Sequence, residues 1–192
     1  HAEAWYLKGE ALFSLERYDE AFTAFEWSLA LDANVSDTWL GKGNALTALD
    51  RRTEAVEAYE HAITLDPTQA VAWLLKGVAL FDLGQTMPAL QAYERATSLD
   101  PTEPEAWVSK GEALAELERS EEAVAAYERA IDLDPDNVDA WIGRGDTLDD
   151  MDDPLAALES YERALALEPQ NADAQSGRGD ALSGMERYEE AL

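Results

Sequence analysis

The side chains that could carry out catalysis are few in this chain of 192 residues. It has no cysteine, and its two histidines are His1 and His61. Nucleophilic catalysis needs a serine, a histidine and an aspartate in one group, and a zinc site needs several ligands together. Neither grouping accompanies His61, so we expect this residue to have a surface or packing role. The sequence therefore predicts a protein that is not an enzyme and that uses no cofactor and no metal.

Two local patterns are weak signals for ligand chemistry. The string Gly-Lys-Gly-Asn that starts at Gly41 lacks the spacing G-x-x-x-x-G-K-[ST] of a phosphate loop and lies inside a predicted helix. An acidic cluster could hold a hard cation, but it lacks the turn glycine and the closing glutamate of an EF-hand loop. We interpret the cluster as solvated carboxylates, and its members are Asp146, Asp149, Asp150, Asp152 and Asp153.

The charge balance is strongly acidic, with 41 Asp and Glu against 14 Lys and Arg and a formal net charge of −27. Such a field repels phosphate backbones and anionic lipid head groups, so we expect neither nucleic acid nor a membrane as a partner. The lack of cysteine fits a reducing compartment, and no apolar run approaches the roughly 18 residues of a membrane span, which favours a cytoplasmic location. Excess acid with scarce lysine is also typical of proteins from salt-rich cytoplasm, and we hypothesise that the source tolerates raised internal salt.

Tryptophans mark a repeat of 34 residues along the chain. They are Trp5, Trp39, Trp73, Trp107 and Trp141, and Gln175 stands where a sixth would fall. Counted from three residues before each tryptophan, the repeats span 2–35, 36–69, 70–103, 104–137 and 138–171, with a partial repeat at 172–192. An internal period of this length is typical of a solenoid that uses one supersecondary unit per repeat.

Two helices per repeat follow from the spacing of the recurring residues. Repeat positions 4, 8 and 11 are Trp, Gly and Leu, which lie on one face of a helix. Positions 20, 24 and 27 carry Ala, then Tyr or Phe, then Ala or Ser, with the same spacing on a second helix. The small residues let the two axes approach closely, so each repeat is predicted to be an αα-hairpin. Most second helices should end before a Pro at position 32, and Asp153-Pro154 predicts an N-cap followed by Pro at the first helical position.

This pattern strongly resembles the tetratricopeptide repeat family over the whole chain. It departs from the family at position 7, which usually carries Leu, at Gln175 in place of Trp, and at Ala33 in place of Pro. The resemblance implies an all-α fold, a right-handed superhelical solenoid of stacked antiparallel helix hairpins in a single domain over residues 1–192. It also implies that the first helices line a concave groove.

A basic residue recurs at position 7 of every repeat. These residues are Lys8, Lys42, Lys76, Lys110, Arg144 and Arg178. Position 25 is acidic in every complete repeat, as Glu26, Glu60, Glu94, Glu128 and Glu162. If position 8 faces position 24 in an antiparallel hairpin, position 7 should lie near position 25 of the same repeat. We therefore predict an ion pair within each repeat, with a packed stem and a hydrated ammonium group as the alternative.

The ends of the array lack the polar capping surface that usually closes a solenoid. The sequence stops at Leu192, just inside the predicted second helix of the sixth repeat. We expect a fragment of a longer array. End-to-end self-association through uncapped terminal repeats is the alternative.

The family's ligand positions are 2, 5, 9, 12 and 13 of the first helix, and their character changes along this chain. An apolar set lies in repeats one to three: Tyr6, Phe13, Leu40, Asn44, Val71, Leu74, Val78 and Phe81. An acidic set lies in repeats four to six: Glu105, Glu112, Glu116, Asp139, Asp146, Asp149, Asp150, Asp173 and Asp180. Residues 1–103 carry 7 basic against 17 acidic residues, and residues 104–192 carry 7 against 24. The groove is thus predicted to run from apolar to acidic.

These positions predict an interaction scaffold that holds a protein or peptide with apolar and basic residues in the groove. The alternative for the groove is ordinary acidic surface beside apolar residues that neighbouring repeats partly bury. A family clamp for peptide carboxylates uses Lys and Asn, and only Asn44 matches it here, which disfavours that ligand. Two other functions stay open: a docking or regulatory segment of a larger enzyme, and a structural spacer that associates with itself.

Overall fold

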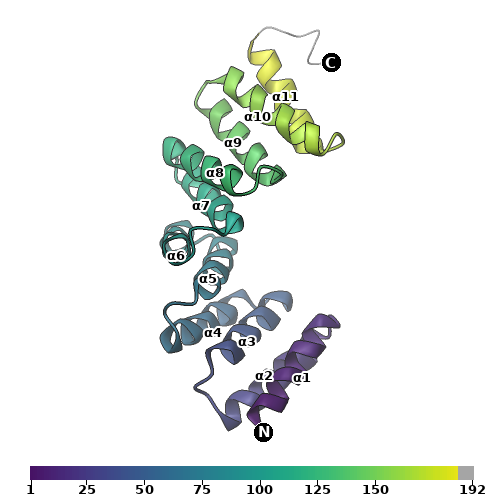
Figure 1. Cartoon of the computed structure of the whole chain (residues 1–192), viewed down its shortest axis with the longest axis vertical. Coiled ribbons are helices and arrows are strands. Elements are labelled where there is room, and N and C mark those ends of the chain that lie inside the picture. Colours follow the sequence, from purple (N-terminus) through teal and green to yellow (C-terminus); the bar gives the residue numbers. More distant parts are fainter. Residues whose placement is uncertain (186–192) are drawn as a thin grey trace. The chain divides into compact units, whose positions relative to one another are not determined.

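The structure is a computed structural model that describes residues 1–185, and the regular structure in this range is entirely helical (Figure 1). Each helix is 13 or 14 residues long. The helices are α1 (Ala2–Ser14), α2 (Tyr18–Leu31), α3 (Ser36–Ala48), α4 (Arg52–Leu65), α5 (Ala70–Asp82), α6 (Thr86–Leu99), α7 (Pro104–Glu116), α8 (Ser120–Leu133), α9 (Val138–Asp150), α10 (Pro154–Leu167) and α11 (Ala172–Gly184).

The chain forms two compact units, unit 1 over His1–Pro101 and unit 2 over Thr102–Leu192. In unit 1 the hairpins are α1/α2, α3/α4 and α5/α6, and in unit 2 they are α7/α8 and α9/α10, followed by α11. Within each unit the second helix of one hairpin packs on the first helix of the next. The predicted all-α stack of helix hairpins is thus confirmed within each unit. The predicted second helix of the sixth repeat, with Ala191, lies outside the described residues.

An aromatic ring at repeat position 24 fills the space between successive first helices. The ring of Phe25 is fully buried, and a β-carbon on either Gly9 or Gly41 would come within 2.6 Å of it. Gly9 belongs to the same repeat as the ring and Gly41 to the next one. The ring therefore lies against bare backbone on both sides, which fixes the distance between α1 and α3.

The turn inside each hairpin uses a residue in the left-handed region just after the first helix. That residue has φ between 57° and 62° at Glu16, Asp50, Glu118 and Asp152, and φ of 71° at Gly84. In the first of these turns the Arg17 N–H donates to the Leu12 carbonyl, which satisfies an end group of α1. Four of the five turns thus hold a non-glycine residue in a conformation that costs about 1 kcal/mol relative to glycine.

Three helices of unit 2, α9, α10 and α11, begin with a side-chain cap. The Asp153 carboxylate accepts from the Ala156 N–H at 3.2 Å, with Pro154 at the first helical position, so this predicted cap is confirmed. Asn137 and Asn171 cap α9 and α11 in the same way. Each cap satisfies one of the free N–H groups of the first helical turn.

The tryptophan at position 4 ties its helix to the loop before it. Trp39 donates from its indole nitrogen to the Ala33 carbonyl at 2.8 Å, and Trp141 donates to the Pro135 carbonyl at 2.9 Å. Gln175, which replaces the sixth tryptophan, donates from Nε2 to the Pro169 carbonyl at 2.9 Å. The glutamine therefore keeps the hydrogen bond of the tryptophan while giving up its apolar surface.

At Lys42, Lys76 and Arg144 the ion pair of position 7 forms with the preceding repeat and not within the same repeat. Lys42 pairs with Glu26 at 3.1 Å, and Lys76 pairs with Glu60 at 2.8 Å. In unit 2, Arg144 pairs with Glu128 at 3.4 Å. Each cation thus reaches back to the preceding repeat, so the predicted register was wrong.

The geometry of an α-helix explains the difference. Side chains of consecutive helical residues project about 100° apart. Position 8 faces the second helix of its own repeat, so position 7 can point to the preceding repeat instead. Gly43, at position 8, does face Tyr59 of its own repeat. Gly41, at position 6, touches Phe25 of the preceding repeat, and Lys42 points to that side as well.

Candidate ligand-binding wall

The candidate site is the first-helix wall, which we define as repeat positions 2, 5, 9, 12 and 13 of the first helices. In unit 1 these helices are α1, α3 and α5, and in unit 2 they are α7, α9 and α11. Helical spacing places these positions along one face of each helix. Each unit therefore carries a wall of its own.

Most of the apolar set in unit 1 packs against the core. Leu74 is only 6% exposed, and the Tyr6 ring lies 6.1 Å from the buried Phe25 ring. Phe13 stacks at a tilt on Tyr18 with 5.3 Å between ring centroids. Leu40, Val78 and Phe81 are half-buried. Val71, with 44% of its surface exposed, is therefore the most exposed member of the apolar set.

Asn44 has a structural partner that the sequence did not reveal. Its Oδ1 accepts from the Tyr59 hydroxyl at 2.9 Å, and the Thr47 hydroxyl lies 3.1 Å from the same phenolic oxygen. Burial raises the pKa of Tyr59 to about 12. The wall residue and the core ring are thus linked by a hydrogen bond, and the string from Gly41 to Asn44 serves packing and not phosphate binding.

Unit 1 also carries an acidic pair that the apolar prediction omitted. Loss of hydration raises the pKa of Glu10, and repulsion from Asp37 raises it further. These two residues occupy positions 9 and 2 of successive repeats, both of which are wall positions. Counting every residue at those positions, and not only the apolar ones, would have found them.

The same relation between positions 9 and 2 recurs in unit 2. Loss of hydration, followed by repulsion from Asp139, raises the pKa of Glu112. Loss of hydration also raises the pKa of Asp146, and repulsion from Asp150 and Asp173 adds to it. The structure therefore brings carboxylates of α7, α9 and α11 close enough to repel one another.

Two hydroxyl groups of the core lie beside these carboxylates. The Tyr161 hydroxyl donates to Asp146 Oδ1 at 2.8 Å, which is the same link from position 24 to position 9 that Tyr59 makes in unit 1. Burial raises the pKa of Tyr127, and the charges of Glu112 and Asp146 raise it further. The buried tyrosines at position 24, Tyr127 and Tyr161, therefore lie next to the acidic wall, and the hydrogen bond from Tyr161 fixes the orientation of Asp146.

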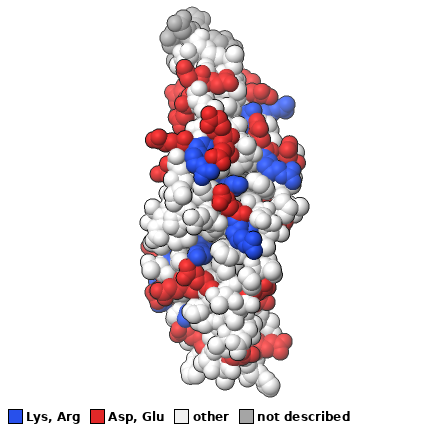
Figure 2. Space-filling model, turned by 90° about the vertical axis from the view of Figure 1, so that its left-hand side faces the viewer, with Lys and Arg blue, Asp and Glu red and all other residues white. Residues whose placement is uncertain are grey.

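All members of the acidic set are exposed at the surface, Glu112 and Asp146 included. Loss of hydration raises the pKa of Asp149, and repulsion from Asp180, Asp150 and Asp152 raises it further. Glu105 and Glu116 lie at opposite ends of α7. The five wall positions of repeats four to six hold no Lys or Arg. Figure 2 shows acidic side chains interspersed with fewer basic ones on one face of the molecule.

The sequence matches a tetratricopeptide repeat model over residues 74–138 and 142–192, which is more than half of the chain. The chain belongs to the tetratricopeptide repeat family. Further models of this family match residues 43–84 and 2–35. No curated protein sequence matches the chain.

Solved structures of tetratricopeptide repeat and other proteins resemble this one at low sequence identity. YrrB, a TPR protein with an unusual peptide-binding site, is 24% identical, with a TM-score of 0.80 over 91% of this chain and 90% of its own. MamA from Desulfovibrio magneticus RS-1 is 23% identical, with a TM-score of 0.82 over 89% of this chain and 97% of its own. PilF from Pseudomonas aeruginosa is 16% identical, with a TM-score of 0.85 over 99% of this chain and 86% of its own. These likenesses show the fold.

The histidine considered as a candidate catalytic residue in this tetratricopeptide repeat chain packs on a tryptophan. His61 stacks on Trp39, with ring centroids 4.3 Å apart, which is the packing role expected of it. Within residues 1–185 no three His, Asp or Glu side chains are grouped so that they could hold a metal ion. None of the helices in this range is both long and apolar enough to cross a membrane.

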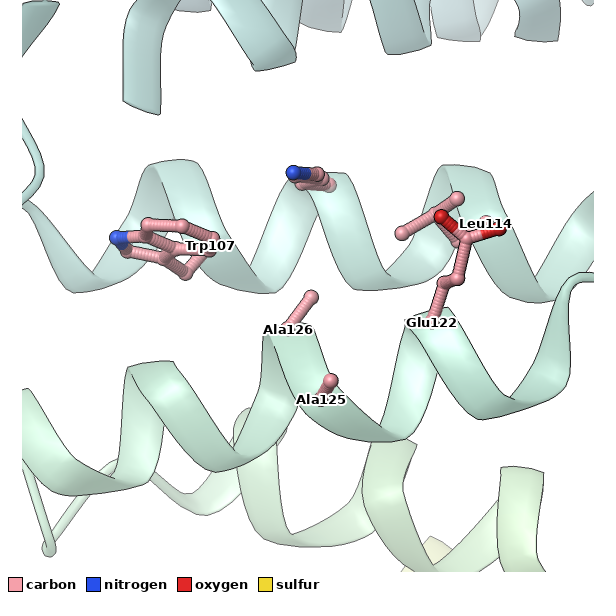
Figure 3. Close-up of a pocket in the computed structure, with 6 residues that line it drawn as sticks. Trp107, Leu114, Glu122, Ala125 and Ala126 are labelled. Carbon is pink, nitrogen blue, oxygen red and sulfur yellow. The ribbon is translucent and has the colours of Figure 1, made fainter. Parts of the chain in front are cut away.

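A small pocket of about 190 Å³ lies on the hairpin of α7 and α8 (Figure 3). Trp107 and Leu114 line it from α7, and Glu122 lines it from α8 together with two alanine methyl groups. Lys110 sits over the Trp107 ring at 5.1 Å, and Arg119 holds Glu122 at 2.7 Å. The charged groups of this pocket are thus engaged within the hairpin, and none of the predicted wall residues lines it.

Proposed function

We propose that the chain is a non-enzymatic scaffold that binds a peptide segment of a partner protein, and that the wall of unit 2 selects lysine and arginine. Tetratricopeptide repeat proteins bind protein or peptide partners. The observation that carries the proposal is the set of carboxylates on α7, α9 and α11, which lie close enough to raise one another's pKa.

A cationic side chain of the ligand would offset both the repulsion between carboxylates and their partial loss of hydrogen bonds to water. Glu112 and Asp146 are exposed, but neighbouring atoms partly shield their carboxylates from water, and each carboxylate is repelled by an acidic neighbour from the next repeat. An ammonium or guanidinium group between such neighbours replaces repulsion by charge-assisted hydrogen bonds. The Tyr161 hydroxyl holds Asp146 in place, so less side-chain entropy is lost when a ligand binds there.

The wall of unit 1 supplies the apolar part of the proposed specificity. Val71 is exposed, and Leu40, Val78 and Phe81 offer the edges of half-buried side chains. This surface is small because Leu74 and the aromatic residues pack inward. We therefore expect basic residues of the ligand to contribute more discrimination than apolar ones.

The test compares a wall variant with a matched variant of equal charge. The wall variant combines Glu112→Gln, Asp146→Asn and Asp149→Asn, each of which keeps a hydrogen-bond acceptor. Binding of a fluorescent 12-residue peptide of alternating Lys and Leu is measured by anisotropy at low and high salt. We expect the wall variant to bind at least about tenfold more weakly than the unmodified chain at low salt, with a smaller difference at high salt.

The control removes the same number of charges from the second helices. It combines Glu121→Gln, Asp132→Asn and Glu159→Gln, which are exposed positions on α8 and α10. We expect the control to bind within about twofold of the unmodified chain, because surface charges away from the site act only through long-range attraction. Equal losses in both variants would show that net charge alone attracts the peptide and that the acidic wall is ordinary surface.

A further inference from the structure

The pocket on the hairpin of α7 and α8 has the size and the apolar lining of a site for one side chain. Its most buried lining residues are Leu114, which is 1% exposed, and Ala126, which is 3% exposed. The half-buried Trp107 lines it from α7, and the methyl group of Ala126 points from α8 towards α7 (Figure 3). Sites that hold a whole small molecule have volumes of about 300–1,000 Å³. A volume of about 190 Å³ is therefore too small for a cofactor and suits a single side chain.

Ala125 leaves this pocket accessible from the surface. It is an exposed residue at repeat position 22 of the fourth repeat. The same position carries a longer polar side chain in repeats two, three and five, namely Glu57, Gln91 and Glu159. These three side chains are also exposed, so the fold accepts a long side chain at this position. A long side chain at Ala125 would extend over the pocket, whereas its methyl group does not.

The charged groups that line the pocket leave a net positive charge. Arg119 donates to both carboxylate oxygens of Glu122, at 2.7 and 2.8 Å, so these two charges neutralise each other. The other charged lining residue is Lys110, which makes no ion pair within the described residues of unit 2. The pocket therefore presents a cation to a ligand, although the chain as a whole has a formal net charge of −27.

A lysine that lies over its tryptophan can still bind a carboxylate. In unit 1, the ammonium group of Lys42 lies 5.4 Å from the centre of the Trp39 ring and 3.1 Å from a carboxylate oxygen of Glu26. The ammonium group of Lys110 lies at a similar distance, 5.1 Å, from the centre of the Trp107 ring. Its contact with the ring therefore leaves it able to donate to a carboxylate of a ligand.

Arg129 adds a second cation beside the pocket. It lies one helical turn after Ala125 on α8, so the two side chains share one face of the helix. Its repeat position, 26, is the one from which His61 stacks on Trp39 in the second repeat, which places Arg129 on the side of α8 nearest Trp107. Arg129 makes no ion pair within the described residues of unit 2.

We propose that this pocket binds an acidic segment of a partner protein, with one large apolar side chain of the segment inside the pocket and neighbouring carboxylates paired with Lys110 and Arg129. Charge complementarity favours such a partner over a second copy of the chain, because two copies with a net charge of −27 repel each other. The ligand has the opposite charge to the one proposed for the wall, and no wall residue lines the pocket. The two sites are therefore independent.

The probe is a short fluorescent peptide of Glu and Ser with a single Phe at its centre, and a matched peptide carries Ala in place of Phe. Binding of each peptide to the full 192-residue chain is measured by anisotropy at low and high salt. We expect the Phe peptide to bind at least about tenfold more tightly than the Ala peptide at low salt, because only the Phe side chain is buried in the pocket. Raised salt should weaken binding. Equal affinities of the two peptides would overturn the proposal.

Ala125→Gln tests whether the pocket holds the Phe side chain. The variant introduces the residue that the third repeat carries as Gln91, so it fits the fold and leaves the charge unchanged. We expect it to bind the Phe peptide no better than the Ala peptide. Ala166→Gln is the matched control, because Ala166 is also an exposed alanine on a second helix, and it should bind as the unmodified chain does. Circular dichroism verifies that both variants keep their helices. Unchanged binding by Ala125→Gln would overturn the proposal.

Arg129→Glu tests the charge beside the pocket. We expect this change to weaken binding of the Phe peptide at least about tenfold. Arg163→Glu is the control, because it makes the same change at the same repeat position of the next repeat, and it should bind within about twofold of the unmodified chain. Equal losses in the two variants would show that net charge alone attracts the peptide, and they would overturn the proposal.

Two further measurements separate this site from the other candidates. The wall variant with Glu112→Gln, Asp146→Asn and Asp149→Asn should bind the acidic peptide at least as tightly as the unmodified chain, because it has lost three negative charges. Weaker binding would place the peptide on the wall and overturn the proposal. Light scattering addresses the other occupant: a dimer of the chain alone that Ala125→Gln abolishes would assign the pocket to a second copy and overturn the proposal of a different partner.

Discussion

Adding one methyl group at Gly43 should disturb the core and the wall of unit 1 together. A β-carbon at this position would lie 2.4 Å from Cε1 and 2.9 Å from Cζ of Tyr59. Carbon atoms pack favourably at about 3.5–4.0 Å, so the ring would have to move by about 1 Å. Tyr59 is 1% exposed, and Leu75 and Ala79 of the next hairpin pack in the same cluster. The ring therefore has no free space to enter.

Two opposing effects decide the size of the change. Alanine in place of glycine in a helix interior stabilises by about 1 kcal/mol. Overpacking costs about 1–3 kcal/mol, and displacement of the Tyr59 ring also weakens its hydrogen bonds to Asn44 and Thr47, each of which contributes about 1 kcal/mol. Steric repulsion wins, and we expect a net destabilisation of about 2 kcal/mol. For a chain of this size that corresponds to a fall in Tm of about 4–8 °C.

Thermal unfolding followed by circular dichroism measures this change. Gly184→Ala is the control, because among residues 1–185 its β-carbon would meet only Pro154 at 3.8 Å, an ordinary contact, and it should not lower Tm. Combining Gly43→Ala with Tyr59→Leu should cost less than the sum of the single changes, because the shorter side chain removes the clash. A Gly43→Ala variant as stable as the unmodified chain, or more stable, would refute the account of the ring as a spacer between first helices.

Three further predictions concern single features of the fold. The buried Thr38 hydroxyl has no hydrogen-bond partner among the described residues, so Thr38→Val should stabilise by about 1 kcal/mol in urea unfolding, and a loss of stability would contradict this. Gly84→Ala should cost about 1 kcal/mol and Glu118→Gly should gain a similar amount, because both positions have positive φ. No atom of the described residues lies within 4 Å of the β-carbon that alanine would add at Gly84, so the cost comes from the backbone alone. Equal Tm values for the two variants would argue against this reasoning. The folded-state pKa values of Glu112 and Asp146 are raised, so their contribution to stability is fully present below the ordinary carboxyl pKa and is lost as the pH rises through the folded values. Tm should therefore rise as the pH falls through the raised pKa values towards the ordinary carboxyl pKa, and Glu112→Gln should flatten that rise.

The sequence was sufficient to predict the helices and their pairing. The recurring Trp, Gly, Leu, Ala and Tyr fix where each helix lies in the repeat, because their spacing matches a helix period and proline ends the second helix. The N-cap at Asp153 was also predictable, since a side-chain cap followed by proline is a local signal. These features depend on neighbours in the sequence or on a strict period.

Features that depend on how the helices pack in three dimensions were harder to predict. The register of the Lys42–Glu26 pair follows from the rotation of one helix against the preceding repeat, which a count of positions within one repeat cannot give. The hydrogen bond from Tyr59 to Asn44 was missed for a related reason, because a residue assigned to the ligand wall also served the core. In the same way, the apolar pattern could not tell the buried Leu74 from the exposed Val71, although the two residues are three apart on one helix.

These contacts show that two faces of a first helix have different roles, and that the aromatic ring at position 24 contacts the helix between them. Positions 3, 6, 7 and 10 meet the preceding repeat, while positions 2, 5, 9, 12 and 13 form the wall. The tyrosine at position 24 touches the backbone at position 8 and, in two repeats, hydrogen-bonds to position 9, as Tyr161 does with Asp146. A change in the core that moves the ring should therefore also move a wall side chain. Neutralising a wall carboxylate with its amide leaves the ring an acceptor, so binding can be altered there without altering the stack.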